Sequence, residues 1–213
     1  MTDQQKDPAS RLSDFLGLAL MALATIGSAW SGFQSSLWSG VQTFALSDAL
    51  RAGRIASEKD LLSSQQRTLD GQAFMEYSRA LAEGNASLAK FLHDRMRPEF
   101  LPALDAWLAT KPLRNPNAPA SPFALPLYQL KAERESLEQE RLAAEANSKA
   151  RQANLASDSY TLLVFLYTPG LFLAGLAGSL IDRRFKCINI VLSLAFIVAA
   201  TVLLFGLPVA RRG

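Results

Sequence analysis

The chain has 213 residues, 49% of them hydrophobic, and a formal net charge of +3 at pH 7. Residues 48–158 contain 15 basic and 15 acidic side chains, so the positive surplus lies towards the two ends of the chain. This distribution argues against a basic patch for nucleic acid and is typical of the flanks of membrane spans. The single cysteine excludes an intrachain disulfide.

Three long stretches contain no charged residue: 15–47, 159–181 and 187–210. A helix needs about 20 apolar residues to cross the hydrocarbon core of a bilayer. We therefore expect an all-α membrane protein with three transmembrane helices. The first stretch follows a short tail with Lys6 and Arg11, as a signal peptide would. It has no clear cleavage site, however, so we expect it to be retained.

The expected parts of the chain follow from these stretches and from the charged and proline-rich segments between them. They are an N-terminal tail (1–13), transmembrane helix 1 (14–42), an extramembrane helical hairpin (43–158) with a proline-rich tip (97–126), transmembrane helix 2 (159–181), a charged turn (182–186), transmembrane helix 3 (187–210) and a C-terminal tail (211–213).

The first span differs from an ordinary transmembrane helix, because small and polar residues recur along one face of it. They follow one another at alternating steps of four and three, the 3.5-residue period of a left-handed helix pair. Alanines continue this seam to residue 56. We expect the seam to pack against another helix. The alternative is a polar path through a ring of copies. The members with larger or polar side chains are Ser28, Ser31, Ser35, Trp38 and Gln42.

Residues 43–158 are expected to form two long helical arms. The second arm, 127–158, contains no glycine or proline, and its small residues between Ala132 and Ala153 repeat the 3.5-residue period. Two such seams predict a closely packed antiparallel pair. Gly71 is a possible break in the first arm, beyond which we expect either a continued, kinked arm or a short stacked helix.

The proline-rich segment 97–126 should close the tip of this hairpin. Its aromatic side chains are candidates for a surface that binds a partner. The alternative is that they form the core of the tip, since small subdomains need their aromatic residues to close. These candidates are Phe100, Trp107, Phe123 and Tyr128.

The orientation is predicted from short basic segments. Arg183, Arg184 and Lys186 lie together with the basic N-terminal tail on one side of the membrane, which favours a cytoplasmic N-terminus and a hairpin outside. Basic residues at the bases of the two arms argue for the reverse.

No pattern predicts an enzyme, a cofactor or a metal site. His93 is the only histidine, and a metal site needs three or four ligands in a fixed geometry. The sequence contains no glycine-rich phosphate loop and no nucleophile elbow.

Two blocks resemble a family of small, functionally uncharacterised bacterial three-span membrane proteins. They are AWSGFQSSLWSG, within residues 28–42, and RPEFLPALDAWLATKPLRNP, within residues 91–130. The resemblance implies a bacterial inner membrane and a design of one span, an extramembrane hairpin and two further spans. It implies no activity, substrate or ligand.

We therefore expect a non-enzymatic, multi-pass membrane protein, surrounded by lipid, that acts as an oligomeric scaffold or binds a protein partner through its hairpin. The competing expectation is an oligomeric channel with the polar seam of the first span lining its path. Nucleic acid is not an expected partner.

Overall fold

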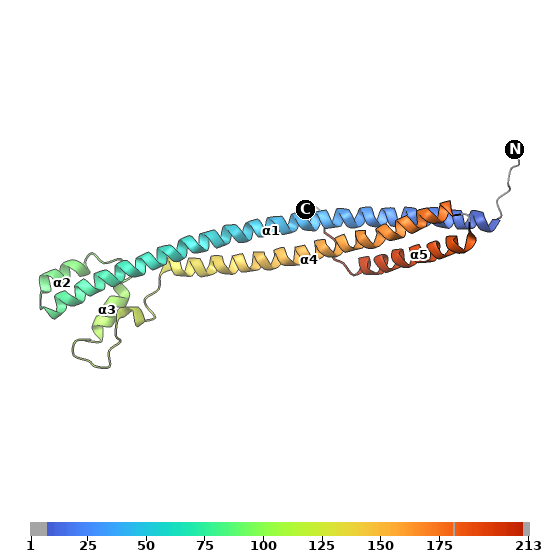
Figure 1. Ribbon diagram of the computed structural model, residues 1–213. Helices are drawn as coiled ribbons and strands as arrows, with labels where there is room; N and C mark the ends of the chain where they lie inside the picture. The colour runs from blue at the N-terminus through green and yellow to red at the C-terminus, as the bar shows by residue number, and fades with distance from the viewer. Residues whose placement is uncertain (1–7, 181, 211–213) are drawn as a thin grey trace. The chain divides into compact units, whose positions relative to one another are not determined.

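The computed structural model describes residues 8–180 and 182–210, with side chains from residue 12 onward. All regular structure in these residues is helical, which confirms the all-α prediction (Figure 1). The helices are α1 (Pro8–Ala82), α2 (Ala86–His93), α3 (Leu101–Ala109), the 3₁₀ helix η1 (Pro122–Ala124), α4 (Lys131–Ser179) and α5 (Arg183–Phe205).

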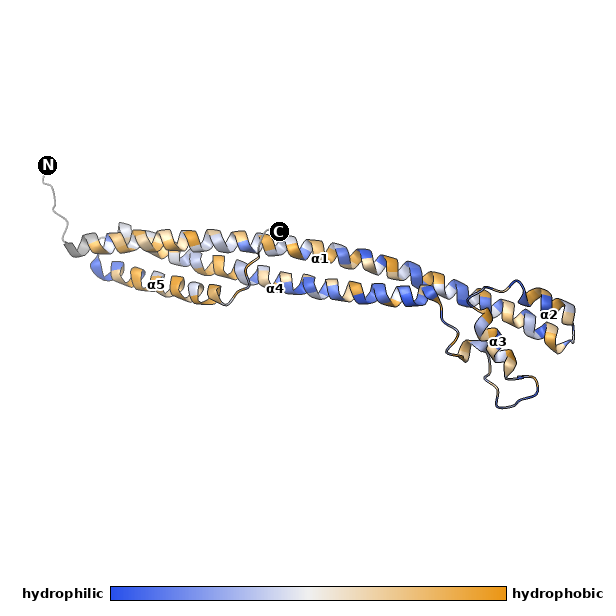
Figure 2. Cartoon of the chain, turned by 180° about the vertical axis from the view of Figure 1, so that it is seen from behind, coloured by the Kyte–Doolittle hydropathy of each residue, from blue (hydrophilic) through white to orange (hydrophobic). Residues whose placement is uncertain are grey.

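Three of the helices, α1, α4 and α5, are long and apolar enough to cross a membrane, as predicted (Figure 2). The chain divides into two compact units. Unit 1 combines Met1–Ser47 with Ala146–Gly213, and unit 2 is Asp48–Glu145. Each unit has its own apolar core.

In unit 1 the core lies where α1, α4 and α5 meet. Tyr160, Leu163 and Tyr167 of α4 are buried there, with Leu20 of α1 and Ile197 of α5. The Tyr167 hydroxyl bonds Thr201 Oγ1 at 3.0 Å, and Ser193 Oγ donates to the carbonyl of Gly170 at 2.7 Å. These two bonds satisfy polar groups that an apolar core would otherwise leave unpaired.

In unit 2, α1 continues without interruption through Gly71 and ends at Ala82. Of the two arm structures considered, the continued helix is therefore the one observed. It ends in a Schellman motif, in which the N–H of Asn85 donates to Ala80 O at 2.9 Å and Gly84 has φ +70°. The Asn85 side chain then caps α2 by accepting from the N–H of Leu88 at 3.1 Å.

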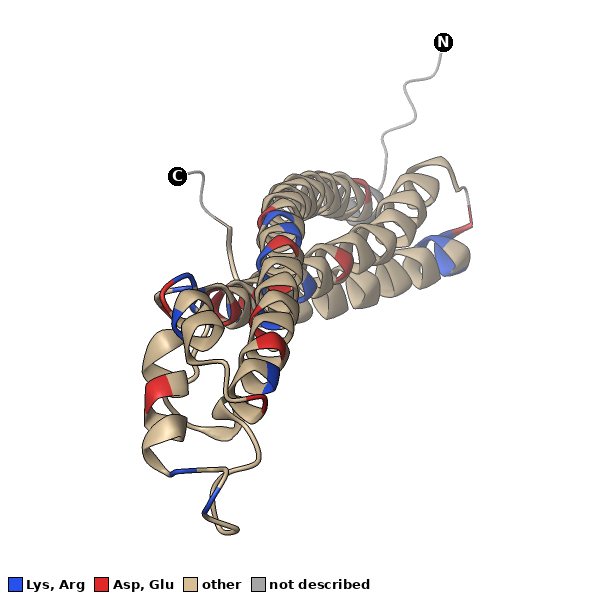
Figure 3. Ribbon diagram, turned by 90° about the vertical axis from the view of Figure 1, so that its left-hand side faces the viewer, with Lys and Arg blue, Asp and Glu red and all other residues tan. Residues whose placement is uncertain are grey.

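Contacts between α1 and α4 within unit 2 involve both backbone and charged groups. Ser136 Oγ donates to Ala56 O at 3.0 Å. Ion pairs join Lys59 to Glu135 at 2.6 Å and Arg67 to Glu133 at 2.9 Å. Figure 3, in which the ribbon is coloured at charged residues, shows both signs of charge along the helices. Ala56 and Ser136, one from each row of small residues, thus lie at a helix contact in this unit.

Several element boundaries differ from the sequence prediction. α4 begins at Lys131 and not after Pro126, because Leu125 is extended and Tyr128 is held by its contacts in the tip. Residues 183–186, expected in a turn, begin α5, because Asp182 caps that helix by accepting from the N–H of Arg184 at 2.8 Å. α5 ends at Phe205, so residues 206–210 do not belong to the third helix.

Candidate functional site

The seam of the first span lies against other parts of the same chain in unit 1. Ser31 is fully buried and donates to the carbonyl of Gly27 at 2.7 Å. Ser35 Oγ lies 3.1 Å from Ser157 Oγ and 2.9 Å from Thr161 Oγ1, both on α4. Two small hydroxyl-bearing residues facing each other allow close approach of the helices, so these contacts are those of helix packing.

The other seam residues have different surroundings. Ser28 is half-buried on α1. The indole N–H of Trp38 donates to Pro208 O at 2.9 Å, beyond the end of α5. Gln42 borders a shallow hollow of about 430 Å³ whose wall includes Asn147 and Arg151 of α4. The seam therefore does not form one continuous polar surface in the chain.

Two buried polar residues of unit 1 were missed by sequence reasoning. Gln34 is only 1% exposed and bonds both main-chain groups of Ala210. Tyr160 is fully buried, and its hydroxyl donates to Pro208 O at 3.1 Å. A glutamine in an uncharged span was a usable signal, because a buried amide requires hydrogen-bond partners.

The aromatic residues of the tip form the core of unit 2. Phe100 is fully buried, Trp107 is buried, and Phe123 and Tyr128 are half-buried. Phe100 stacks on Phe123 with ring centroids 5.3 Å apart, and Tyr128 meets the edge of both rings. The Trp107 indole N–H donates to Pro119 O at 2.7 Å. Phe100 and Trp107 thus have no open surface to offer a partner in this conformation.

A buried carboxylate lies beside this cluster. Asp70, at the side of α1, is only 2% exposed. Its Oδ1 accepts from Arg97 Nε at 3.0 Å, and its Oδ2 accepts from the Tyr128 hydroxyl at 3.0 Å. Burial and the bond to Asp70 raise the pKa of Tyr128, so the phenol stays protonated. The arrangement ties α1 to the loop before α3 and to the residues before α4.

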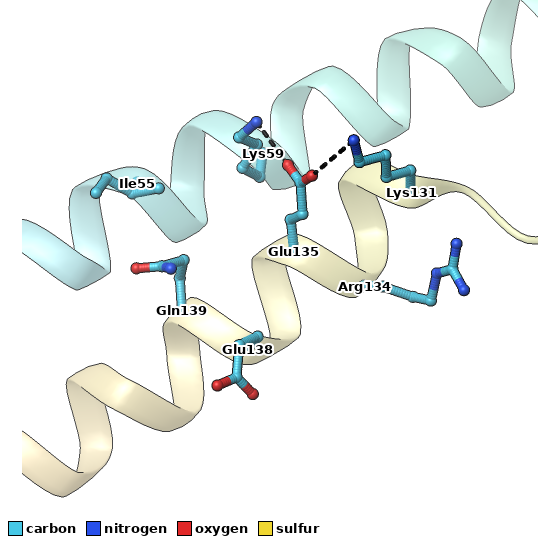
Figure 4. Close-up of a pocket in the computed structure, with 7 residues that line it drawn as sticks. All are labelled: Ile55, Lys59, Lys131, Arg134, Glu135, Glu138 and Gln139. Atoms are coloured by element: carbon cyan, nitrogen blue, oxygen red, sulfur yellow. Dashed lines mark ion pairs between the residues drawn. The ribbon is translucent and has the colours of Figure 1, made fainter.

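Opposite charges line a second hollow of about 340 Å³ in unit 2 (Figure 4). Glu135 lies between Lys59, at 2.6 Å, and Lys131, at 3.6 Å. The hydrogen bond from Lys59 lowers the pKa of Glu135, and the same bond raises the pKa of Lys59. Arg134 and Glu138 point away from α1. The hollow has no buried unpaired charge to attract a ligand, and we regard it as a helix contact.

His93 is engaged in pairing between side chains. Its Nε2 lies 2.8 Å from Asp105 Oδ1, and its Nδ1 lies 3.7 Å from Asp94 Oδ1. Among the residues with described side chains, no group of three or more His, Cys, Asp or Glu could hold a metal ion. The pair connects α2 to α3.

Comparison of the chain with protein-family models, with curated proteins and with solved structures found no match.

Proposed function

We propose that the chain is a non-enzymatic integral membrane protein that assembles with further copies of itself through its extramembrane arm. In this proposal α1, α4 and α5 cross a bacterial inner membrane, and α1 and α4 continue outside it as an antiparallel hairpin. The order of the α1–α4 contacts supports the antiparallel arrangement, because Arg67 pairs with Glu133 whereas Ala56, eleven residues earlier, meets Ser136.

The observation on which the assembly rests is a set of exposed apolar side chains on α1, away from its contact with α4. The inner face of this arm is buried at Ala52, Ala56 and Ser63. On the remaining surface of the same helix, four large apolar side chains are each more than half exposed. We call this set the outer row: Leu50, Leu61, Leu69 and Met75.

A helix with apolar residues on two sides is typical of a bundle larger than a pair, because each face must be covered to leave water. Leu50, Leu61 and Met75 lie close to one line of the helix, because about three and four turns separate them. Leu69 lies about 80° round the helix from Leu61. The charges of the arms are balanced, which favours contact between identical copies over repulsion.

The contacts of the seam give no support to the alternative of a channel. A path through a ring of copies requires side chains that face a symmetry axis. Ser31 is fully buried, and Ser35 is bonded to Ser157 and Thr161 of the same chain. We therefore propose packing as the role of the seam.

The experiment is the mass of the purified chain in nanodiscs or mild detergent, for the wild type and for the double variant Leu61→Glu/Leu69→Glu. We expect a closed oligomer for the wild type and a lower mass for the variant. Leu113→Glu is the matched control, because Leu113 is 70% exposed but lies in the tip loop. A monomeric wild type, or an oligomer that the double variant leaves intact, would refute assembly through the outer row.

A further inference from the structure

The chain beyond α5 is attached to α1 and α4 by hydrogen bonds to its main chain. α5 ends at Phe205, and residues 208–210 have no helical structure. Trp38 Nε1 of α1 and the Tyr160 hydroxyl of α4 both donate to the carbonyl of Pro208, at 2.9 and 3.1 Å. One carbonyl oxygen therefore accepts from two helices.

The second attachment is a pair of bonds between one side chain and one residue. Gln34 Oε1 accepts from the N–H of Ala210 at 2.9 Å, and Gln34 Nε2 donates to the Ala210 carbonyl at 3.3 Å. An amide side chain that meets both the N–H and the C=O of one residue reproduces the pairing that a neighbouring β-strand would offer. The geometry is therefore suited to an extended peptide.

Burial makes these bonds necessary. With the segment in place, Gln34 is only 1% exposed and Tyr160 is fully buried, so the segment supplies partners that water does not. If the segment left, the Gln34 amide and the Tyr160 hydroxyl would lose these partners beside the apolar core of unit 1, which is costly. The site is thus complete only when a peptide occupies it.

We propose that Gln34, Trp38 and Tyr160 form a binding site for an extended peptide backbone, and that the chain's own residues 207–210 occupy it as a clasp between α1 and α4. All four hydrogen bonds go to main-chain atoms of the bound segment. The site therefore recognises an extended backbone and depends little on which side chains the segment has. It makes one demand on sequence: the residue opposite Gln34 must have an N–H and so is not proline. Val209, more than half exposed, is free to vary.

The segment 207–210 lies next to a direct contact between α1 and α4. Ser35, next to Gln34 on α1, bonds Ser157 and Thr161, and Thr161 directly follows Tyr160 on α4. Release of the segment therefore removes the link between α1 and α4 through the Pro208 carbonyl and leaves the Ser35 bonds to join the two helices. This inference concerns unit 1 alone and does not depend on assembly through the outer row.

The test is the rate at which trypsin cleaves the full-length chain after Arg211 in nanodiscs, followed by mass spectrometry. A protease must bind the residues before the cut in extended form, so cleavage requires the clasp to open. We expect Trp38→Phe and Ala210→Pro each to speed this cleavage about tenfold, the effect of losing one well-formed bond, and Gln34→Leu, which loses two bonds, to speed it at least as much. Cleavage after Arg114, in an exposed loop, is the internal reference for trypsin activity in each sample.

Two controls isolate the backbone bond. Ala210→Ser retains the N–H at the same position, and Val209→Ala changes a side chain that the site does not bind. Both should be cleaved at the wild-type rate. The double variant Gln34→Leu/Ala210→Pro should be no faster than Gln34→Leu alone, because the proline removes only the N–H bond that the loss of Gln34 has already removed. Wild-type cleavage of Ala210→Pro, or multiplying effects in the double variant, would overturn the proposal.

Discussion

At the scale of single residues, α1 and α4 approach each other closely at Gly27 of α1. A Cβ atom built on Gly27 would lie 2.5 Å from the Tyr167 ring of α4, well inside van der Waals contact. Tyr167 is buried and bonded to Thr201, so its ring has no room to move away. The absence of a side chain at Gly27 is therefore what allows α1 and α4 to pack at this distance.

We predict that Gly27→Ala destabilises unit 1 by about 1–3 kcal/mol, the usual cost of overpacking a core. The measurement is thermal unfolding of the purified protein in detergent. Gly32→Ala is the matched control, because a Cβ there meets nothing within 4 Å. Equal unfolding temperatures for the two variants would show that the Tyr167 ring leaves room for a side chain at Gly27.

A second prediction at this scale concerns Tyr128 and its bond to Asp70. The pKa of Tyr128 is raised by burial and by this bond, so the folded chain holds the phenolic proton more tightly than the unfolded chain. The protonated phenol therefore makes its full contribution to the free energy of unfolding below pH about 10, the ordinary pKa of tyrosine. This contribution is lost as the pH rises above that value.

Tyr128→Phe should lower the free energy of unfolding at neutral pH by about 1–3 kcal/mol, since Asp70 loses one of its donors. Between pH about 10 and 11 the variant should lose less stability than the wild type. Denaturant unfolding at several pH values measures both effects. A variant with the same pH dependence as the wild type would contradict a role for this phenol.

Residue roles were only partly predictable from the sequence. The sequence left two roles open for the tip aromatics, and only burial distinguishes a core residue such as Phe100 from a surface one. Asp70 was missed, although the 3.5-residue period, extended beyond Ala56, places Ser63, Asp70 and Tyr77 on the seam, where all three are buried. A carboxylate on an apolar seam signals a cationic partner, but the period cannot say that it is Arg97.

At the scale of elements, two glycines, one inside α1 and one just after it, have opposite roles in unit 2. Gly71 lies inside the helix, where a Cβ meets nothing within 4 Å. Gly84 lies beyond its end with φ +70°, a conformation that costs other residues about 1 kcal/mol or more. The first position therefore needs no glycine, and the second does.

We predict that Gly71→Ala stabilises the arm by about 0.5–1 kcal/mol, because alanine loses less backbone entropy in a helix. Gly84→Ala should instead destabilise it by a similar or larger amount. Hydrogen exchange of the amides in the last turns of α1 measures the two variants side by side. If both variants changed the protection of these amides in the same direction, the end of the helix would not be fixed by the Schellman motif at Gly84.

Helix existence was easier to predict than helix ends. Long runs of helix-forming residues predicted α4, but its start depends on Tyr128, whose ring and hydroxyl are held by residues distant in sequence. The start of α5 was locally encoded by Asp182, which is a suitable N-cap, yet the basic residues after it suggested a turn. α5 ends at Phe205, and the residues after it bond Gln34 and Trp38 of α1 through their main chain. No local sequence pattern reveals these long-range bonds.

At the scale of the whole molecule, the proposed topology makes a prediction about the two sides of the membrane. That topology puts one span, in α4, between the tip loop and the start of α5, and so predicts that Leu113 and Cys187 lie on opposite sides. Both side chains are exposed. The basic residues 183–186 favour the cytoplasm for the start of α5, because short basic segments are retained there.

Cells that express the wild-type chain should therefore react with a membrane-permeant maleimide at Cys187 and not with an impermeant one. The variant Cys187→Ser/Leu113→Cys should react with both reagents once the outer membrane is opened. Lysed cells serve as the control for reactivity. The reversed pattern would invert the orientation but keep the three spans. Labelling of both positions from the same side would refute the span in α4, and with it the three-span topology, because a single crossing must separate the two sites.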